Sequence, residues 1–347
     1  AWDTSFAVQA AVEAGLQGEF PDMCARAWGW IAREQVRALP HGDWRHWRQA
    51  IRGGWGFSTA EQAWPVSDTT AEAFKAVLAL RGDACVASCP EFPDEHCFDT
   101  VQFLLSYQNA DGGWATYENN RGWAWYELLN PACVFGNIMI DYSYVECSAS
   151  AMQALMDFHG QFPGHRAREI KRAVARGATF IEAMQRHDGS WYGCWGSCFT
   201  YGCWFSVEGL VCAGRDPVAS PAIRRCVEFL LSKQNADGGW GEDFASCFNR
   251  EYASRERLYG CDSGSTVVCT AWALLALTAG QCHDRSAVRR GAEFLMRRQL
   301  PSGDWAQENI CGVFNRSVGI TYTAFRNVFP LWALGRCARW SGPGGGT

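Results

Sequence analysis

A short pattern, Gln-x-x-x-Gly-x-Trp, recurs along this chain and constrains its fold more than any other feature. Each copy follows a segment with Phe and Leu or Ile at helical spacing, so each is expected where a helix ends and Gly can adopt a left-handed backbone. We expect the Gln to hydrogen-bond backbone groups at a neighbouring helix end and the Trp to stack over it, as structural clamps. The clamps occupy residues 108–114, 185–191, 234–240 and 299–305, with a looser relative running from Gln35 to Gly53, Gly54 and Trp55.

Two kinds of helical segment alternate between the clamps. One kind is rich in small and aromatic residues, and we expect it at 2–13, 67–80, 144–158, 200–213, 266–278 and 320–334. The other carries Arg, Glu and a Phe-Leu stripe, and we expect it at 24–36, 95–107, 168–184, 222–233 and 286–298. Mostly apolar helices alternating with amphipathic ones predict an inner ring of helices inside an outer ring. The fold class is therefore all-α, an (α/α)6 barrel with one outer helix missing, and no strand-like alternation competes with it.

Charge and cysteine usage exclude several classes of protein. The formal net charge is -5 and no basic run is present, so nucleic-acid binding is not expected. The 17 Cys are scattered singly, and the closest sets (Cys85 with Cys89, Cys194 with Cys198) lack zinc-finger spacing, so they are interpreted as reduced core residues. No signal peptide is visible, and the longest apolar run, 267–280, is too short to span a bilayer.

The stretch Trp64 to Glu72 carries the candidate chemistry. Ser67, Asp68 and Thr69 stand at the start of an amphipathic helix, where such side chains can cap the backbone. The residues alone leave two interpretations of Asp68 open: a cap or first-turn acid, or a functional carboxyl.

Taken together, these motifs resemble the triterpene cyclases and, among them, the 2,3-oxidosqualene cyclases. The Gln-x-x-x-Gly-x-Trp repeats are that family's hallmark, and Trp64 to Glu72 is similar to its acid motif, where Val-Ser-Asp-Cys-Thr-Ala-Glu is usual. Further similar stretches are 2–7, 141–147, 195–202 and 312–315. The resemblance covers the C-terminal half of a family member. It implies that 1–347 is a single catalytic barrel domain, and that the missing outer helix, a second barrel and a membrane-inserting segment belong to chain before Ala1.

The family's reaction implies roles for three residues around the acid. Asp68 would protonate the epoxide of 2,3-oxidosqualene, because a carboxyl among apolar walls stays protonated and a dry site favours proton transfer. Cys147 would orient it. Thr69 stands where the family usually has a second Cys, and its hydroxyl is expected to donate a hydrogen bond in place of the thiol.

Aromatic rings would stabilise the carbocations that follow, since a ring face attracts a cation without trapping it. The family positions matched here are Trp2, Phe57, Tyr117, Trp195, Phe314 and Tyr322. Phe57 would face an earlier ring cation and Phe314 a late one. The family's terminating base is a His before this chain's start, paired with a Tyr that matches Tyr117. The seven His here lie in expected turns or polar helix ends and do not fit that role: His41, His46, His96, His159, His165, His187 and His283.

Two residues shortly before Asp68 stand at positions that differ between family members with different products. Gln62 and Val66 stand where lanosterol-forming members carry Gln or Cys and Val, whereas cycloartenol-forming members carry His and Ile, so lanosterol is favoured. The alternative that both residues simply pack the helix entry stays open.

Other functions remain as alternatives. A squalene–hopene cyclase would show further acids beside Asp68, and a protein prenyltransferase β-subunit would need zinc on an Asp-x-Cys such as Asp22 with Cys24 or Asp83 with Cys85. An inactive cyclase is a further possibility, favoured by Thr69. The resemblance implies no cofactor, a water-insoluble substrate, and peripheral attachment to the endoplasmic reticulum membrane or a lipid droplet through the N-terminal half. We expect the 347-residue fragment to be soluble when expressed alone.

Overall fold

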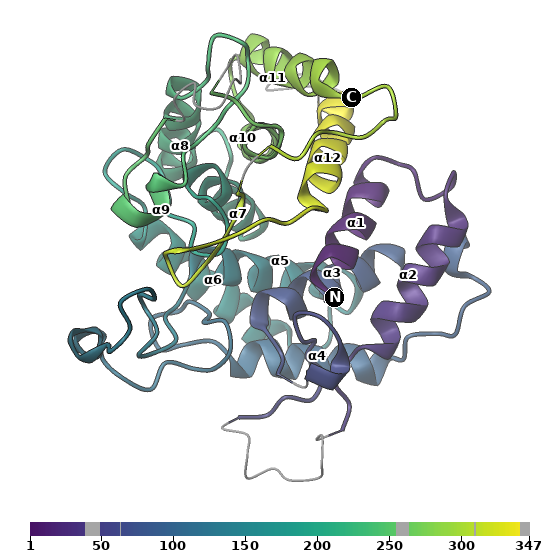
Figure 1. Ribbon diagram of the computed structural model, residues 1–347. Helices are drawn as coiled ribbons and strands as arrows, with labels where there is room; N and C mark the ends of the chain where they lie inside the picture. Colours follow the sequence, from purple (N-terminus) through teal and green to yellow (C-terminus); the bar gives the residue numbers. More distant parts are fainter. Residues whose placement is uncertain (39–48, 63, 255–263, 309, 341–347) are drawn as a thin grey trace. The chain divides into compact units, whose positions relative to one another are not determined.

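The computed structural model describes residues 1–38, 49–62, 64–254, 264–308 and 310–340 (Figure 1). The chain divides into two compact units, one formed by Ala1–Gly122 with Ile140–Phe180 and the other by Trp123–Met139 with Ile181–Thr347. We call them unit 1 and unit 2. Both are built mainly from α-helices, so the all-α prediction is confirmed.

In unit 1, helix α3 (Ser67–Leu80) packs against four other helices: α1 (Trp2–Glu13), α2 (Pro21–Arg33), α4 (Asp94–Ser106) and α5 (Val145–Gln161). Short 3₁₀ turns lie at η3 (Ala60–Gln62) and η4 (Ala84–Val86), and α6 (Ala167–Ala183) follows α5. Proline marks where two of these helices begin, because its fixed φ suits a first turn and its missing N–H has no partner there. Pro21 is the first residue of α2, and Pro93 directly precedes α4.

In unit 2, helix α10 (Val267–Ala279) packs against α7 (Phe199–Cys212), α8 (Pro221–Ser232), α11 (Arg285–Arg298) and α12 (Phe325–Arg339). The short elements are η5 (Ala124–Leu129) and α9 (Ala245–Asn249). A small antiparallel hairpin joins β1 (Gly312–Phe314) to β2 (Val318–Ile320), with Gly312 opposite Ile320 and Phe314 opposite Val318.

Every predicted helix has a counterpart, and all but one match the predicted ends within three residues. The exception is the predicted helix at 320–334, which is wrong at its start because α12 begins only at Phe325. The β-branched residues Val318 and Ile320 pair with β1 instead, as their stiff side chains favour. The sequence analysis did not predict this hairpin, because its strands of three residues each are too short to show a sequence alternation.

The number of buried residues distinguishes the two predicted kinds of helix. All residues of α3 except Ala79, and all of α10 except Ala279, are buried, as expected for inner helices. In contrast, α2 buries only Cys24, Trp28 and Ile31. The outer helix α2 thus contributes one apolar stripe, while the inner helices α3 and α10 are covered on all sides.

The clamp glutamines bond backbone carbonyls as predicted, and the Trp makes an additional hydrogen bond, while its stacking over the Gln stays a prediction. Gln108 Nε2 donates to the carbonyl of Gly112 at 2.8 Å and to that of Ala173, in the first half of α6, at 2.8 Å. Trp114 Nε1 donates to the Leu104 carbonyl at 2.7 Å, which fixes the indole on its own outer helix. Gly112 has φ +94°, the left-handed conformation that glycine favours. The clamps of Gln108, Gln185 and Gln234 therefore tie the end of one outer helix to the next outer helix.

The looser relative is also a clamp. Gln35 Nε2 donates to the carbonyls of Gly53 at 3.3 Å and His96 at 3.0 Å, and Trp55 Nε1 donates to the Ile31 carbonyl at 2.8 Å. The Gln and Gly lie 18 residues apart rather than 4. The spacing between the Gln and the Gly is longer in this clamp, but the hydrogen bonds are of the same kind.

The clamp tryptophans also anchor the inner helices through their backbones. The Trp55 N–H donates to Thr70 Oγ1 at 2.8 Å, and the Val66 N–H donates to the Trp55 carbonyl at 2.9 Å. Trp114 is joined in the same way to Ser148 at the start of α5. The clamps consequently fix where α3 and α5 begin, and those two helix starts carry the candidate site.

Candidate functional site

Asp68 lies in the first turn of α3, whose N-cap is Val66 without a side-chain cap. The expected Ser/Asp/Thr capping of this helix is not found. Ser67 Oγ instead donates to the Ala115 carbonyl at 2.5 Å, and Thr70 Oγ1 accepts from the Trp55 N–H. These side chains hold the neighbouring clamp loops, because the loop backbone passes close enough to compete with the helix for them.

The Asp68 carboxyl is enclosed, and a substantial fraction of it is protonated near neutral pH. Only 5% of the Asp68 surface is exposed. Burial is the main cause that raises the pKa of Asp68 from 3.8 to about 7, and the nearby carboxylates of Glu146 and Glu72 contribute to the rise. Two hydrogen bonds oppose the rise in pKa: the Thr69 N–H donates to Oδ1 at 2.7 Å, and the Cys147 thiol donates from α5.

The Thr69 hydroxyl does not make the hydrogen bond that the sequence analysis expected. Its backbone N–H bonds Asp68, but its fully buried hydroxyl has no hydrogen-bond partner among the described residues. The helical backbone directs the side chain away from the Asp68 oxygens, and burial leaves no solvent to satisfy the hydroxyl. Thr69 therefore supports the acid through the main chain in this structure.

The sequence analysis missed Thr116 as a member of this site. Its hydroxyl lies 3.6 Å from Cys147 Sγ, and both residues are buried. Either atom can be the donor in this pair, and when the thiol proton points to Asp68 the Thr116 hydroxyl donates to sulfur. Thr116 follows the clamp Trp114 by two residues, so the clamp loop delivers it to the acid.

Asp141 was also missed, although it opens one of the stretches quoted for the resemblance. Its carboxylate accepts N–H bonds from Thr116 at 3.3 Å, Tyr117 at 2.5 Å and Glu118 at 3.1 Å. Burial raises the pKa of Asp141 to about 6, while these three donors lower it. Asp141 thereby holds the loop that presents Thr116 and Tyr117, a role that no sequence spacing reveals.

A buried polar cluster lies one helical turn beyond Asp68. Glu72 Oε2 accepts from Gln9 Nε2 at 2.7 Å, and Glu72 Oε1 accepts from Ser150 Oγ at 2.7 Å. Lys75 Nζ lies 3.0 Å from Glu72 and also donates to Gln153 at 3.1 Å. The Glu72 charge is thus paired within unit 1, as a fully buried carboxylate requires.

Three of the expected cation-stabilising aromatics belong to unit 1. The rings of Trp2 and Phe57 stack with centroids 6.1 Å apart, with Trp2 buried and Phe57 38% exposed. Tyr117 is half-buried, and burial together with the charge of Asp68 raises its pKa to about 12. Tyr117 is therefore close enough to Asp68 to sense its ionisation.

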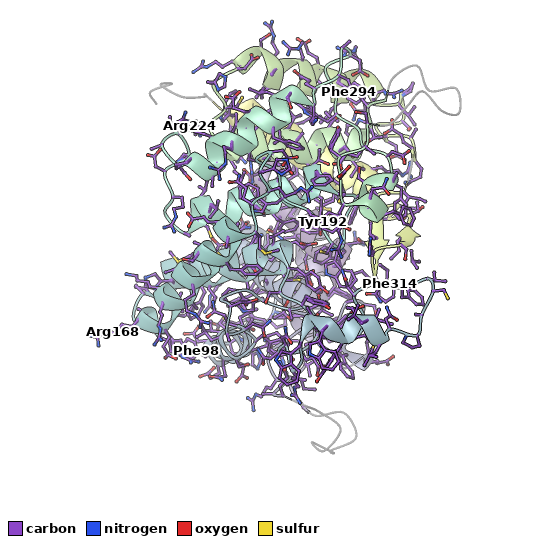
Figure 2. All side chains as sticks on the ribbon, turned by 90° about the vertical axis from the view of Figure 1, so that its left-hand side faces the viewer. Phe98, Arg168, Tyr192, Arg224, Phe294 and Phe314 are labelled. Carbon is purple, nitrogen blue, oxygen red and sulfur yellow. The ribbon has the colours of Figure 1, made fainter. Side chains whose placement is uncertain are left out.

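The other three aromatics belong to unit 2 and cluster around the hairpin. Trp195 and Phe314 have ring centroids 5.9 Å apart, and Figure 2 shows Phe314 at the hairpin. The Val313 N–H donates to the Trp195 carbonyl at 3.0 Å, which ties the two segments. Tyr322 lies between β2 and α12 and stacks on Phe325 at 4.4 Å.

The two product-related positions have different environments. Val66 is buried beside the acid, whereas Gln62 is exposed and accepts a hydrogen bond from the Ser58 N–H at 3.1 Å. Gln62 thus also serves the turn at 58–62. The packing alternative raised from the sequence accordingly describes part of its role.

The histidines of the described residues lie where the sequence placed them. His96 is in the first turn of α4, His159 in the last turn of α5, and the others are in loops: His165, His187 and His283. His41 and His46 lie outside the described residues. Within the described ranges, no three His, Cys, Asp or Glu side chains are grouped as metal ligands, and each described Cys is free.

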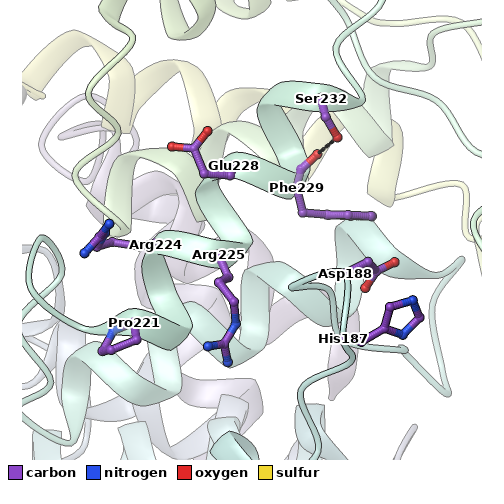
Figure 3. Close-up of a pocket in the computed structure, with 8 residues that line it drawn as sticks. All are labelled: His187, Asp188, Pro221, Arg224, Arg225, Glu228, Phe229 and Ser232. Carbon is purple, nitrogen blue, oxygen red and sulfur yellow. Dashed lines mark hydrogen bonds between the residues drawn. The ribbon is translucent and has the colours of Figure 1, made fainter.

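A surface hollow of about 440 Å³ lies in unit 2, between α8 and the clamp at 185–191 (Figure 3). Arg224, Arg225 and Glu228 project from α8, and His187 and Asp188 come from the clamp. Charges of both signs line it and it is open at the surface, so it does not enclose a polyene in a dry cavity. The acid of unit 1 is the stronger candidate site.

Sequence comparisons identify similar proteins along nearly the whole chain. The family model for the squalene–hopene cyclase C-terminal domain matches residues 1–339. The chain is 48% identical over 340 residues to the lanosterol synthase of Homo sapiens, covering 96% of this chain and 45% of that protein. It is also 48% identical over 337 residues to the cycloartenol synthase of Dictyostelium discoideum, covering 96% and 46%. The chain thus spans less than half the length of these curated relatives.

Solved structures share the fold at low sequence identity. The type II terpene cyclase MstE from Scytonema, in complex with geranylgeranyl dihydroxybenzoate, superposes with a TM-score of 0.64 at 15% identity, covering 97% of this chain and 87% of that one. The ent-copalyl diphosphate synthase from Streptomyces platensis gives 0.61 at 16% identity, covering 97% and 50%. The helical architecture is consistent with the α/α toroid predicted from the sequence.

Proposed function

Since this chain belongs to the squalene–hopene cyclase C-terminal domain family, we propose that residues 1–347 form the acid-bearing catalytic domain of a 2,3-oxidosqualene cyclase. The observation that carries the proposal is Asp68, a buried carboxyl whose pKa is raised to about 7. Such a group holds a proton at neutral pH and can deliver it where water is excluded. Its surroundings offer hydrogen bonds from Thr69 and Cys147 that stabilise the carboxylate left behind.

The proposed reaction is an isomerisation. Asp68 transfers its proton to the epoxide oxygen, the C–O bond breaks, and the nearest double bond supplies the electron pair that closes the first ring. Trp2, Phe57, Tyr117, Trp195, Phe314 and Tyr322 would stabilise successive cations through their ring faces, at about 0.5–2 kcal/mol each. A base outside these residues would remove the last proton, so the chain's described residues start and guide the cascade.

The substrate is proposed to be an epoxide rather than squalene. An epoxide oxygen is more basic than an alkene, so one carboxyl suffices without further acids beside it in the sequence. Ser67 and Thr69 flank Asp68 without adding further acids. We favour lanosterol as the product because Val66 is a small buried residue beside the acid, while cycloartenol synthase activity is the alternative.

The site of action is proposed to be a membrane surface, because the substrate is insoluble in water. In the described ranges, no helix combines the length and hydropathy that a bilayer crossing needs. Peripheral attachment to the endoplasmic reticulum membrane or a lipid droplet, through chain outside these residues, would bring the domain to its substrate.

A chimera tests the proposed function. These 347 residues would replace the matching part of the human lanosterol synthase, and the chimera would be incubated with 2,3-oxidosqualene and, separately, with squalene. We expect a tetracyclic product from the epoxide only, and at least about a thousandfold loss in Asp68→Asn. Mass spectrometry of the product separates lanosterol from cycloartenol.

The control variants distinguish a wrong assignment of Asp68 as the acid from a chimera that is inactive for another reason. Asp141→Asn alters a buried carboxyl near the acid without removing the proposed proton donor, so it should keep measurable turnover. If Asp68→Asn cyclises the epoxide as fast as the unmodified chimera, Asp68 is not the acid. Conversion of squalene at a similar rate would favour the squalene–hopene alternative.

A further inference from the structure

Helix α3 carries a buried ion pair one turn beyond the proposed acid. Glu72 is fully buried and Lys75 is 7% exposed. Lys75 Nζ lies 3.1 Å from Glu72 Oε1 and 3.0 Å from Glu72 Oε2, so the ammonium bridges both carboxylate oxygens. Replacing a buried ion pair by apolar residues of the same volume often leaves a protein as stable as before, or more so. Stability of the fold therefore does not explain the presence of this pair.

Neutral side chains from α1 and α5 hold the pair in place. Gln9 Nε2 donates to Glu72 Oε2 and Ser150 Oγ donates to Glu72 Oε1, both at 2.7 Å. Lys75 Nζ also donates to Gln153 Oε1 at 3.1 Å. Each oxygen of Glu72 thus receives two donors, which suits a carboxylate, and all five residues belong to unit 1.

The ion pair is oriented along α3 with its negative end toward Asp68. Asp68, Glu72 and Lys75 stand at positions i, i+4 and i+7, which share one face of a helix. The rise of about 1.5 Å per residue puts the Cα of Glu72 about 6 Å along the axis from that of Asp68, and the Cα of Lys75 about 10.5 Å. Two opposite charges at unequal distances leave a net potential with the sign of the nearer one. In agreement, the Glu72 carboxylate is among the charges that raise the pKa of Asp68.

Other titratable groups act on Asp68 or on its neighbours from outside α3. They are Glu146 and Cys147 of α5, Tyr117 after the Trp114 clamp, and Asp141. Of these, Glu146 raises the pKa of Asp68 and the Cys147 thiol lowers it. Helix α1 contributes the neutral Gln9, and the residues of α2 and α4 that form ion pairs do so with partners outside this cluster. Lys75 is thus the cation that α3 itself brings to the carboxylate beside the acid.

We propose that Lys75 is a positioning residue: it fixes Glu72 as a carboxylate one turn from Asp68, and the oriented pair sets the pH range in which Asp68 keeps its proton. A net negative potential opposes ionisation of Asp68, so more of the acid stays protonated near neutral pH. The inference rests on the proposed function only for the role of Asp68 as the acid. How far Asp68 is protonated can be measured without turnover.

Infrared spectroscopy of the 347-residue chain follows the proton on Asp68. A protonated carboxyl has a C=O stretching band that a carboxylate lacks, and subtracting the spectrum of the same chain with Asp68→Asn assigns the band to Asp68. The band is titrated with pH in the unmodified chain, in Glu72→Gln and in the double variant Glu72→Gln with Lys75→Met. Gln153→Met is the matched control, because it changes a neutral partner of Lys75 and no charge.

We expect the midpoint of the titration to fall most in Glu72→Gln, by about one pH unit, because the nearer negative charge is gone and the ammonium remains. The double variant loses both charges, so its midpoint should fall less. Packing defects do not distinguish the sign of a charge, so this order identifies an oriented ion pair. The double variant is neutral and close in shape to the pair, so it should fold even where Glu72→Gln, with its unpaired buried ammonium, does not.

A midpoint in the double variant that equals or exceeds that of the unmodified chain overturns the proposal. The same holds if Lys75→Met has no effect on the midpoint of Glu72→Gln, because the ammonium would then not act on Asp68, or if Gln153→Met shifts the midpoint as far as the double variant does. In the chimera, the alkaline limb of the pH–rate profile should move with the infrared midpoint. The expected order of midpoints in a chain that cyclises no epoxide would support this inference and contradict the proposed function.

Discussion

The hydroxyl of Thr116 lies 3.6 Å from the thiol of Cys147, and that thiol in turn donates to Asp68. The three side chains come from a clamp loop, α5 and α3. They form a chain of donors ending on the acid, which polarises the thiol and favours the ionised carboxylate. The support expected from a second cysteine at position 69 is thus supplied partly from position 116.

Thr116→Val should weaken the acid. Loss of the hydroxyl leaves the Cys147 thiol a poorer donor, so the pKa of Asp68 rises further above 7 and the proton is released less readily. We expect a fall in kcat of about three- to tenfold in the chimera, with the alkaline limb of the pH–rate profile moved to higher pH. Thr116→Ser keeps the hydroxyl and should resemble the wild type. Identical profiles for Val and Ser would remove Thr116 from the site.

Thr69→Val should stabilise the protein. The valine has nearly the shape of threonine, and it removes a buried hydroxyl that has no partner in the structure. Relieving one unsatisfied buried hydroxyl is worth about 1 kcal/mol or more in the free energy of unfolding. Urea denaturation of the 347-residue chain measures this. A loss of stability of similar size would show that the hydroxyl does make a bond, as the sequence analysis expected.

Asp68→Asn should change how stability depends on pH. Between the ordinary pKa of 3.8 and the folded value of about 7, the folded protein holds a proton that the unfolded chain has released. The contribution of Asp68 to the free energy of unfolding is therefore fully present below pH 3.8. It decreases by about 1.4 kcal/mol per pH unit as the pH rises to about 7. The free energy of unfolding of the asparagine variant does not decrease in this way.

The measurement is the free energy of unfolding of both proteins from pH 4 to pH 8. The variant should gain on the wild type by several kcal/mol, up to roughly 4, as pH rises through this window. Asp141, whose pKa is also raised, contributes the same slope to both proteins and cancels in the difference. A difference independent of pH would mean that Asp68 is ionised in the folded state from low pH.

Gln234→Ala and Gln299→Ala should differ in their cost to the isolated chain. Gln234 donates to the carbonyls of Gly238 and Ala287 and accepts from Arg290, so its removal should lower the free energy of unfolding by about 2–3 kcal/mol. Gln299 makes one described bond and is exposed, so its loss should cost less than about 1 kcal/mol. Thermal unfolding compares the two, and equal losses would mean that Gln299 makes more stabilising contacts than the one bond described.

The sequence by itself determined the helices and the clamps, and it singled out Asp68 as the candidate acid. Helical periodicity and the Gln, Gly and Trp of the clamps are local features, because a helix and its C-terminal glycine turn are set by residues a few positions apart. Asp68 and Cys147 could be named from their motifs alone. Even the stretched clamp between Gln35 and Trp55 was visible, since its residues kept their order.

Only the tertiary structure decided how the Asp68 carboxyl is supported. Thr116 and Asp141 reach the site through hydrogen bonds between segments far apart in sequence, and the direction of the Thr69 hydroxyl depends on the helical backbone around it. Likewise, α12 begins later than predicted because Val318–Ile320 pairs with β1. Burial and long-range pairing set these outcomes, and neither is encoded in the spacing of a single segment.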